Sequence, residues 1–186
     1  MKNILIISGH PDLQQSVANK TIIETLEQAL PQAEIRRLDT LYPDCRFDIA
    51  AEQAALLKAD IIVWQFPFSW YSIPGVMKLW LDKVFLHGFA HGAQGKLGGK
   101  KLLLSFTTGA PESVYQKGGF FRHTIEEYLP PIETIATLCN LDYQPPIYTT
   151  GISYTDRANE AAINAQKELA TAHAEKLIAA LKALAA

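Results

Sequence analysis

Three stretches of the sequence combine residue types that could bind a ligand through neutral groups. The first, GHPDLQQSVAN at residues 9–19, places His10 and Ser16 just before an expected helix. Free backbone N–H groups and the positive end of the helix dipole make such a start an anion site that needs no Lys or Arg. We therefore expect a phosphate group here. The alternative is that Ser16 only caps the helix and His10 only completes the turn.

The second stretch, PFSWYSIP at residues 67–74, sets two large aromatic side chains, Trp70 and Tyr71, between two prolines. The apolar run before it stops at Pro67, so the aromatic residues directly follow a buried strand. Rigid prolines and flat rings form an apolar wall with backbone N–H groups at a fixed height, which suits a planar heterocycle. The alternative is that Trp70 and Tyr71 only pack on a lid.

The third stretch, TTGAPESVYQKGG at residues 107–119, is rich in glycine and hydroxyl groups. Gly109 permits close approach of the backbone, and Tyr115 has a polar tip on an apolar ring. Donors aimed at the edge of a pyrimidine-like ring would stabilise the negative charge that appears when the ring takes up a hydride. Glycine-rich loops are common, so this stretch indicates a site only together with the other two.

Apolar runs and apolar periodicity predict the elements that position these stretches. Strands that alternate with helices form parallel βαβ units, whose right-handed crossovers put helices on both faces of one sheet. We expect a three-layer α/β/α fold with a five-stranded parallel sheet in the flavodoxin-like order 2-1-3-4-5, whose strand ends bring the three stretches together. Strands are expected at 3–8, 33–38, 60–66, 101–106 and 143–149, and helices at 16–30, 50–57, 74–86, 118–138 with an interruption at Pro130-Pro131, and 156–186.

Length and composition exclude several classes of protein. The 186 residues, 48% of them apolar, suit a single domain over residues 1–186. With 17 Lys and Arg against 19 Asp and Glu, the net charge of −2 gives no footprint for nucleic acid. The apolar runs are shorter than a signal peptide or a membrane span needs, so we expect a cytoplasmic protein with no direct membrane insertion.

Cysteine and histidine residues predict neither a disulfide framework nor a metal site. Cys45 and Cys139 lie far apart and outside any C-x-x-C pair. The histidines near the middle of the chain are scattered over two loops and lack a helical pair of ligands. We therefore expect no metal. His173 stands among alanines on the last predicted helix, where we expect it to face solvent.

Taken together, these residues resemble the NAD(P)H:quinone oxidoreductase family of flavodoxin-like flavoproteins, in its short bacterial form. The resemblance is carried by SGHPDLQQSVAN at 8–19, FPFSWYSIPGVMKLWLDKVF at 66–85, GFAHG at 88–92 and KKLLLSFTTGAPESVYQKGG at 100–119. It implies a bound flavin, FMN first and FAD as the alternative, with NAD(P)H as co-substrate. The flavin-binding residues that it implies are His10, Ser16 and Val17 near the phosphate, and Pro67, Phe68, Ser69, Trp70, Tyr71, Thr107, Thr108, Gly109, Ala110 and Tyr115 near the ring.

The activity that the resemblance implies is a ping-pong reaction: NAD(P)H gives a hydride to the flavin, leaves, and is replaced by a quinone or similar flat acceptor. Tyr115 is the catalytic candidate, as a hydrogen-bond donor to the acceptor oxygen. The family also implies a homodimer with sites at the interface, which would cover helix 74–86 and the turn Phe89-Ala90-His91. Animal members pair the tyrosine with a His where this chain has Phe121, and His123 is offset, so the resemblance does not extend to a Tyr–His relay.

Two other functions stay open at this stage. Close relatives of the short form are regulatory flavoprotein subunits of glutathione-gated potassium efflux systems, which would add peripheral association with a membrane transporter. A one-electron carrier such as flavodoxin would have a strongly acidic composition and a T/S-x-T-x-x-T phosphate loop, whereas this chain is near-neutral and has His10-Pro11-Asp12. The sequence also leaves open the physiological acceptor and the preference between NADH and NADPH.

Overall fold

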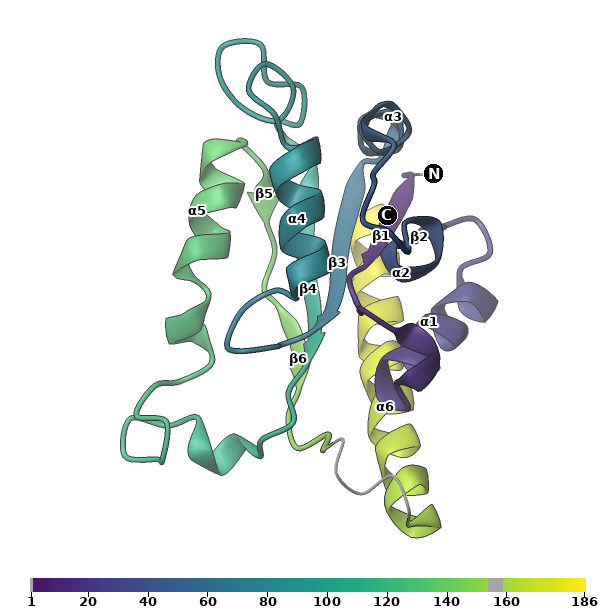
Figure 1. Cartoon of the computed structure of the whole chain (residues 1–186), viewed down its shortest axis with the longest axis vertical. Helices are drawn as coiled ribbons and strands as arrows, with labels where there is room; N and C mark the ends of the chain where they lie inside the picture. The colour runs from purple at the N-terminus through teal and green to yellow at the C-terminus, as the bar shows by residue number, and fades with distance from the viewer. Residues whose placement is uncertain (1, 154–158) are drawn as a thin grey trace.

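The computed structural model describes residues 2–153 and 159–186, with helices covering both faces of one parallel sheet (Figure 1). The pairings between its named strands are all parallel, and the predicted flavodoxin-like order is confirmed. Along the sheet lie β2 (Glu34–Arg37), β1 (Ile4–Ser8), β3 (Ile61–Pro67), β4 (Lys101–Thr107) and β5 (Asp142–Tyr143).

The predicted last strand, 143–149, is divided in two. β5 pairs with the start of β4, and β6 (Ile147–Thr149) pairs with its end. Pro145 and Pro146 lie between the two short strands. Proline has no N–H to give to the ladder, so the pairing stops and then resumes. Among the described residues the sheet therefore has six strands, with β5 and β6 sharing the edge beside β4.

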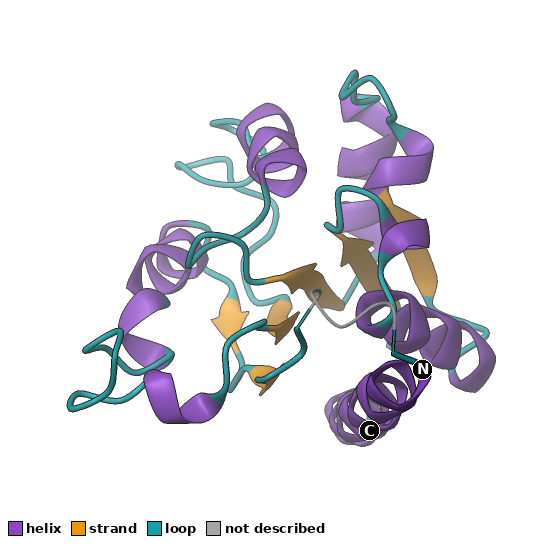
Figure 2. Cartoon of the chain, turned by 60° about the horizontal axis from the view of Figure 1, so that its bottom comes forward, coloured by secondary structure: helices purple, strands orange, loops and turns teal. Residues whose placement is uncertain are grey.

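The helices form two groups with the strands between them, as the view along the ends of the strands shows (Figure 2). None of the described helices combines the length and the apolar composition that a bilayer crossing requires. One face of the sheet carries α1 (Ala18–Ala29) and α6 (Glu160–Ala185), and the other carries α2 (Leu38–Leu41), α3 (Ile49–Lys58), α4 (Gly75–Val84) and α5 (Pro130–Leu138). Short 3-10 turns lie in the loops at Leu13–Gln15, Glu112–Val114 and Glu126–Tyr128.

The helix predicted over 118–138 begins only at Pro130. Pro130 and Pro131 occupy the first positions of α5, where their missing N–H groups would have no intrahelical partner in any case. The two prolines are thus a helix start and not an interruption. For the last helix, the start predicted at Asp156 lies outside the described residues, and the described helix begins at Glu160.

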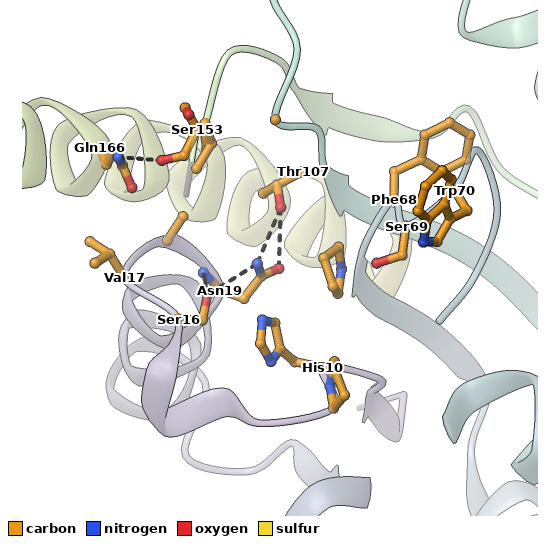
Figure 3. A pocket seen from close by; sticks show the side chains of 15 residues that line it. His10, Ser16, Val17, Asn19, Phe68, Ser69, Trp70, Thr107, Ser153 and Gln166 are labelled. Atoms are coloured by element: carbon orange, nitrogen blue, oxygen red, sulfur yellow. Dashed lines mark hydrogen bonds between the residues drawn. The ribbon is translucent and has the colours of Figure 1, made fainter. Parts of the chain in front are cut away.

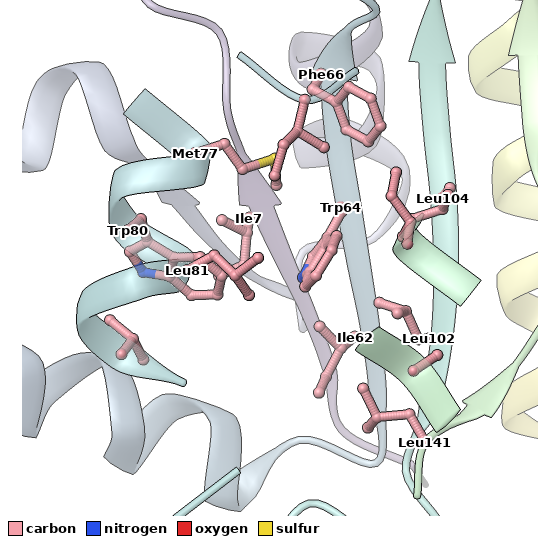
Figure 4. Close-up of a cluster of buried hydrophobic side chains, with 14 of the residues drawn as sticks. Ile7, Ile62, Trp64, Phe66, Met77, Trp80, Leu81, Leu102, Leu104 and Leu141 are labelled. Carbon is pink, nitrogen blue, oxygen red and sulfur yellow. The ribbon is translucent and has the colours of Figure 1, made fainter. Parts of the chain in front are cut away.

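Side chains of the strands alternate between two cores. On the face of α3, α4 and α5 the core contains large rings, and Trp64 of β3 lies edge-on to Trp80 of α4 with ring centroids 6.4 Å apart (Figure 4). On the face of α1 and α6 the core consists of Ile, Val, Leu and Ala side chains. Burial of these side chains holds both groups of helices on the sheet.

One carboxylate lies inside the aromatic core. Glu52 of α3 has no exposed surface, and it accepts hydrogen bonds from Arg36 Nε (2.7 Å), Tyr42 OH (2.6 Å) and Trp80 Nε1 (2.8 Å). A buried carboxylate is tolerated when an opposite charge and further donors satisfy it. Glu52 therefore joins β2, α3 and α4, and α4 is the helix that follows the second stretch.

The surface expected at a homodimer interface is partly internal. Phe89 and Ala90 are almost fully buried, because both pack in the aromatic core of their own chain. Of the predicted helix 74–86, Leu79 and Leu86 keep the largest exposed apolar faces. Exposed apolar surface here is thus smaller than expected, and the homodimer stays a prediction.

A buried polar row crosses the face of α1 and α6 near the ends of the strands. Ser8, Gln65 and Ser105 are in direct register on β1, β3 and β4, and all three are fully buried. His173 of α6 meets this row, with Nε2 2.8 Å from the Ser105 hydroxyl and Nδ1 2.9 Å from the Thr149 hydroxyl. The polar row therefore links the sheet to α6 by side-chain hydrogen bonds.

The expectation that His173 faces solvent is wrong, because its side chain is 1% exposed. Ala170 and Ala174, both buried, lie beside it on the inner face of α6, and their small side chains let the helix lie close to the sheet. Burial lowers the pKa of His173 to about 4, and the charge of Lys176 acts in the same direction. The ring is therefore neutral at neutral pH.

Candidate functional site

A pocket of about 410 Å³ opens at the carboxyl-terminal edge of the sheet, where β1, β3 and β4 end (Figure 3). Its volume lies in the range of small-molecule sites. The three stretches meet there, as predicted, together with α6. Its lining comprises His10, Pro11, Ser16, Val17, Ala18 and Asn19 from the first stretch, Pro67, Phe68, Ser69 and Trp70 from the second, Thr107 and Gly109 from the third, and Ile152, Ser153 and Gln166 beyond them.

The first stretch presents the start of α1 to the pocket. Ser16 Oγ accepts a hydrogen bond from the backbone N–H of Asn19 (3.1 Å), so it does satisfy one donor of the helix. Val17 and Ala18 line the pocket, and their backbone N–H groups have no acceptor among the described residues. These two donors and the helix dipole favour a phosphate or another anion at this end of the pocket.

His10 adds an imidazole to the wall. Its Nδ1 accepts a hydrogen bond from the N–H of Asp12 (3.0 Å), which ties the ring to the turn before the 3-10 helix. Gly9, just before it, lies against Met77 of α4, and a Cβ there would be 2.7 Å from Met77 Sδ. Glycine at this position therefore lets α4 pack under the first stretch.

Two buried amides support the pocket, and one of them, Asn19, lines it. Asn19 Nδ2 donates to Ser16 Oγ (3.3 Å) and to Thr107 Oγ1 (3.2 Å), as drawn in Figure 3, and Gln65 Nε2 donates to Asn19 Oδ1 (2.7 Å). The network fixes the first stretch relative to β3 and β4. Neither Asn19 nor Gln65 was among the predicted site residues. The signal for Gln65 is a lone amide inside the apolar run DIIVWQF, because a buried amide needs partners.

The second stretch turns tightly beside the pocket. Trp70 and Tyr71 have positive φ angles of 50° and 64°, and the N–H of Ser72 donates to the carbonyl of Ser69 across the turn (3.1 Å). Two consecutive residues with positive φ are typical of type I′ turns, which prefer Asn-Gly, so bulky residues strain this turn. Trp70 lines the pocket and is 92% exposed, so its ring is at the solvent-facing rim.

The second and third stretches offer further backbone donors. The N–H of Phe68 donates to the carbonyl of Thr107 (2.8 Å), which sets the two stretches side by side. Beyond this bond, four backbone N–H groups have no acceptor among the described residues, and they belong to Trp70, Tyr71, Gly109 and Ala110. Donors of this kind suit the polar edge of a planar ligand.

Four predicted residues do not line the pocket: Tyr71, Thr108, Ala110 and Tyr115. The Thr108 hydroxyl donates to the carbonyl of Ala110 (2.9 Å), and the N–H of Thr108 donates to the carbonyl of Thr149 (2.9 Å). Thr108 and Ala110 therefore support the third stretch from behind. Tyr71 stacks on Tyr128, with ring centroids 5.1 Å apart.

Tyr115 lies in an aromatic cluster next to the pocket. It is 7% exposed, and its ring meets Phe121 and Tyr128 edge-on, with centroids 5.1 Å and 6.4 Å apart. Burial raises the pKa of Tyr115, although a hydrogen bond with the Thr108 side chain acts in the opposite direction. The hydroxyl thus keeps its proton at neutral pH and can act as a hydrogen-bond donor.

Helix α6 closes the last side of the pocket. Gln166 Nε2 donates to the carbonyl of Ser153 (2.7 Å), and Gln166, Ser153 and Ile152 line the pocket. None of them was predicted. Gln166 lies seven residues before His173, so the two buried polar side chains share the inner face of α6. A buried Gln and His at helical spacing is the signal that could have found this wall.

The lining supplies neutral donors and apolar surface, and none of its described residues is a Lys, Arg, Asp or Glu. In the described part of the chain, no group of three or more His, Cys, Asp or Glu side chains is placed to hold a metal ion. A ligand with an anion at one end and a flat, polar-edged ring at the other matches the arrangement best.

Comparisons with known proteins agree with this architecture. A protein-family model described as a flavodoxin-like fold matches residues 2–174. General stress protein 14 from Treponema denticola, crystallised in complex with FMN, is 34% identical, with a TM-score of 0.85 over 96% of this chain and 99% of that chain.

Two further solved structures are similar. An NADPH-quinone reductase from P. pentosaceus is 28% identical, with a TM-score of 0.75 over 95% of this chain and 97% of that chain. A protein described as a thermophilic tryptophan halogenase from Streptomycin violaceusniger is 34% identical, with a TM-score of 0.79 over 91% of this chain and 96% of that chain. The halogenase and the quinone reductase are named for different reactions, so this similarity alone does not assign a reaction to the chain.

Proposed function

The chain belongs to the flavodoxin-like fold family, and from this premise we propose that it is a flavin-dependent oxidoreductase that reduces quinones or similar flat acceptors with NAD(P)H. The observation that carries the proposal is the difference in chemistry between the two ends of the pocket. Val17 and Ala18, whose N–H groups have no acceptor in the described part of the chain, lie at one end, and the strained aromatic turn at Trp70 lies at the other. An anionic tail and a flat ring are the two parts of a flavin nucleotide.

The donor chemistry of the pocket fits FMN. FMN is favoured over FAD because the similar protein from Treponema denticola was crystallised with FMN. Phosphate binding would rest on helix N–H groups, a hydroxyl and an imidazole, without a fixed cation. In this proposal His10, Ser16, Val17 and Ala18 hold the phosphate, Pro67, Phe68, Ser69, Trp70 and Tyr71 hold the ring, and Thr107, Thr108, Gly109 and Ala110 form or support its polar edge.

The chemistry that a bound flavin supplies is a two-electron transfer from NAD(P)H to a flat acceptor. The residues of the chain bind and orient. The N–H group of Gly109, which lines the pocket, offers a donor where negative charge would develop, and the buried amides of Asn19 and Gln65 hold the helix start in place. The exposed face of Trp70 leaves the site open to flat molecules.

Tyr115 is our candidate for orienting the acceptor. It is a neighbour of the pocket and not part of its lining, and burial favours its protonated form. In this role it donates a hydrogen bond to the acceptor oxygen. It is not required for holding the flavin, which has other donors. Its loss would slow turnover without abolishing it.

The proposal is tested by purifying the protein, recording its visible absorption spectrum, and releasing any cofactor with acid for mass determination. The expected result is a yellow protein that releases FMN and whose colour is bleached by NADH or NADPH and restored by a quinone. A colourless protein that takes up neither FMN nor FAD on incubation would refute the proposal. Release of FAD would correct the cofactor and leave the reaction unchanged.

A further inference from the structure

An exposed patch next to the pocket combines aromatic rings with a cation. The surface formed by Trp70, Tyr71, Phe120, Phe121 and Arg122 is called the aromatic–basic patch. Trp70 and Phe120 are 92% and 83% exposed, the two highest values among the exposed large hydrophobic residues. Ring centroids of Tyr71 and Phe121 lie 5.3 Å apart, and those of Phe120 and Phe121 lie 5.5 Å apart. The patch thus runs from the pocket wall at Trp70 to Arg122.

The backbone of this patch is held in a strained conformation. Arg122 has a positive φ of 61°, as Trp70 and Tyr71 have in the adjacent turn. The loop is closed by hydrogen bonds of 3.1 Å from the N–H of Phe121 to the carbonyl of Val114 and from the N–H of Arg122 to that of Gly119. Strain of this kind clusters at ligand sites, where the surrounding structure holds a side chain in place for binding.

The charge of Arg122 is not neutralised by any side chain in the described part of the chain. Its guanidinium forms no ion pair with any described residue. The nearby carboxylate of Glu127 lies 3.8 Å from Lys117 Nζ and 3.4 Å from His123 Nδ1, and Glu126 accepts a hydrogen bond from Tyr148 OH (2.8 Å). These carboxylates have partners of their own, which leaves the guanidinium for an external anion.

Resting on the proposed function, we propose that the aromatic–basic patch binds the adenosine 2′-phosphate end of NADPH and that Arg122 makes the protein prefer NADPH to NADH. A planar guanidinium donates two parallel hydrogen bonds to a phosphate. An exposed ring such as that of Phe120 offers a face on which adenine stacks. NADH has no phosphate at the 2′ position, so charge complementarity at Arg122 distinguishes the two donors.

Binding of adenosine nucleotides to the protein as purified, measured by calorimetry, tests the patch without catalysis. The wild type should bind adenosine 2′,5′-bisphosphate about tenfold or more tightly than adenosine 5′-monophosphate, as a charge-assisted hydrogen-bond pair provides. Arg122→Gln should abolish this preference, and Phe120→Ala should weaken both nucleotides. Arg46→Gln removes another exposed arginine, one paired with Asp44, and should keep the wild-type preference.

Steady-state kinetics supply the second readout. In Arg122→Gln the ratio of kcat/KM for NADPH to kcat/KM for NADH should fall about tenfold or more. An unchanged ratio, or an equal loss with both donors, would overturn the inference while leaving a working flavin enzyme. Conversely, a protein that takes up no flavin but binds the bisphosphate through Arg122 would refute the proposed function and support the patch.

Discussion

Gln65 Nε2 donates a hydrogen bond of 2.7 Å to Oδ1 of Asn19, and this bond joins the centre of the sheet to the start of α1. Both side chains are buried, Gln65 completely and Asn19 at 4% exposure. A buried amide leaves a large energetic penalty when its partner is removed. The N–H groups at the start of α1 are therefore positioned by the sheet as well as by the loop before them.

Asn19→Ala tests this relationship. It removes the acceptor of Gln65 and the donor to Ser16 and Thr107, so we expect the free energy of unfolding to fall by about 1–3 kcal/mol. Affinity for FMN should fall about tenfold or more, since the helix start loses its fixed position. Denaturant unfolding of the apoprotein and its fluorescence titration with FMN measure the two effects.

The matched control is Asn164→Ala, which removes an exposed asparagine on α6. It should leave FMN affinity as in the wild type and change the free energy of unfolding by less than about 0.5 kcal/mol. If the Asn19 variant bound FMN as tightly as this control, the buried amides would have no part in positioning the site.

Tyr115→Phe removes the hydroxyl that we propose as donor to the acceptor oxygen. Because one neutral hydrogen bond is lost, we expect kcat/KM for the quinone to fall roughly three- to tenfold. The rate at which NAD(P)H bleaches the flavin should not change. Steady-state assays at limiting and saturating acceptor, with stopped-flow reduction, separate the two half-reactions. Because burial raises the pKa of Tyr115, the wild-type rate should not fall through loss of this proton between about pH 6 and 9.

Tyr143→Phe serves as the control for this substitution. The hydroxyl of Tyr143 is buried without a hydrogen-bond partner among the described residues, so its removal should leave the kinetics unchanged and the stability equal or higher. Quinone reduction by Tyr115→Phe that matched the Tyr143 variant at both acceptor concentrations would exclude an orienting role for Tyr115.

Because His173 is buried as a neutral ring, we expect the free energy of unfolding to fall in mild acid. Its pKa is about 4 in the folded protein and about 6.5 in an unfolded chain, so the unfolded chain binds the proton more readily. The contribution is fully present above pH 6.5 and is lost as the pH falls towards 4. A shift of this size corresponds to a loss on the order of 3 kcal/mol. Urea unfolding at a series of pH values across this window measures it.

Carboxylates also titrate in part of this pH window. The contribution of His173 is therefore obtained by comparing the pH dependence of the free energy of unfolding between variants. His173→Gln keeps an amide that can bond to Ser105 and Thr149 but cannot titrate, and it should flatten the pH dependence relative to the wild type. His87→Gln, at an exposed histidine, should retain the wild-type slope. Equal slopes for all three proteins would mean that His173 is not the titrating group.

Much of the fold follows from patterns that short segments carry by themselves. The apolar runs around Ile6, Val63 and Leu103 predict buried parallel strands because both faces of each strand are covered. Strand order and the position of the pocket then follow from the alternation of strands and helices. The loops after β1, β3 and β4 carry most of the pocket lining for this reason.

What the sequence does not predict depends on contacts between distant segments. His173 reads as a surface residue because its neighbours are alanines, yet those small side chains are what allow α6 to lie against the sheet. Gln166 lines the pocket from a helix far along the chain from the three stretches. Arg122 has a strained backbone that local composition does not indicate, since it depends on how the loop closes at Gly119.

Because the turn at Trp70 is strained, we expect that relieving the strain raises the stability of the apoprotein and lowers its affinity for FMN. Trp70→Gly relieves the positive φ of 50° and should raise the free energy of unfolding of the apoprotein by about 0.5–1 kcal/mol. The same change removes the ring from the pocket wall, so FMN should bind about tenfold more weakly. Thermal unfolding of the apoprotein and titration with FMN measure the two changes.

Cys45→Gly separates the two effects. Cys45 is exposed, has a similar φ of 57° and does not line the pocket, so glycine there should relieve strain without affecting FMN binding. Higher stability in both variants with weaker FMN binding in Trp70→Gly alone is the expected pattern. A Trp70 variant that is less stable yet binds FMN normally would mean that the turn is held for folding, and that its aromatic ring is no part of the site.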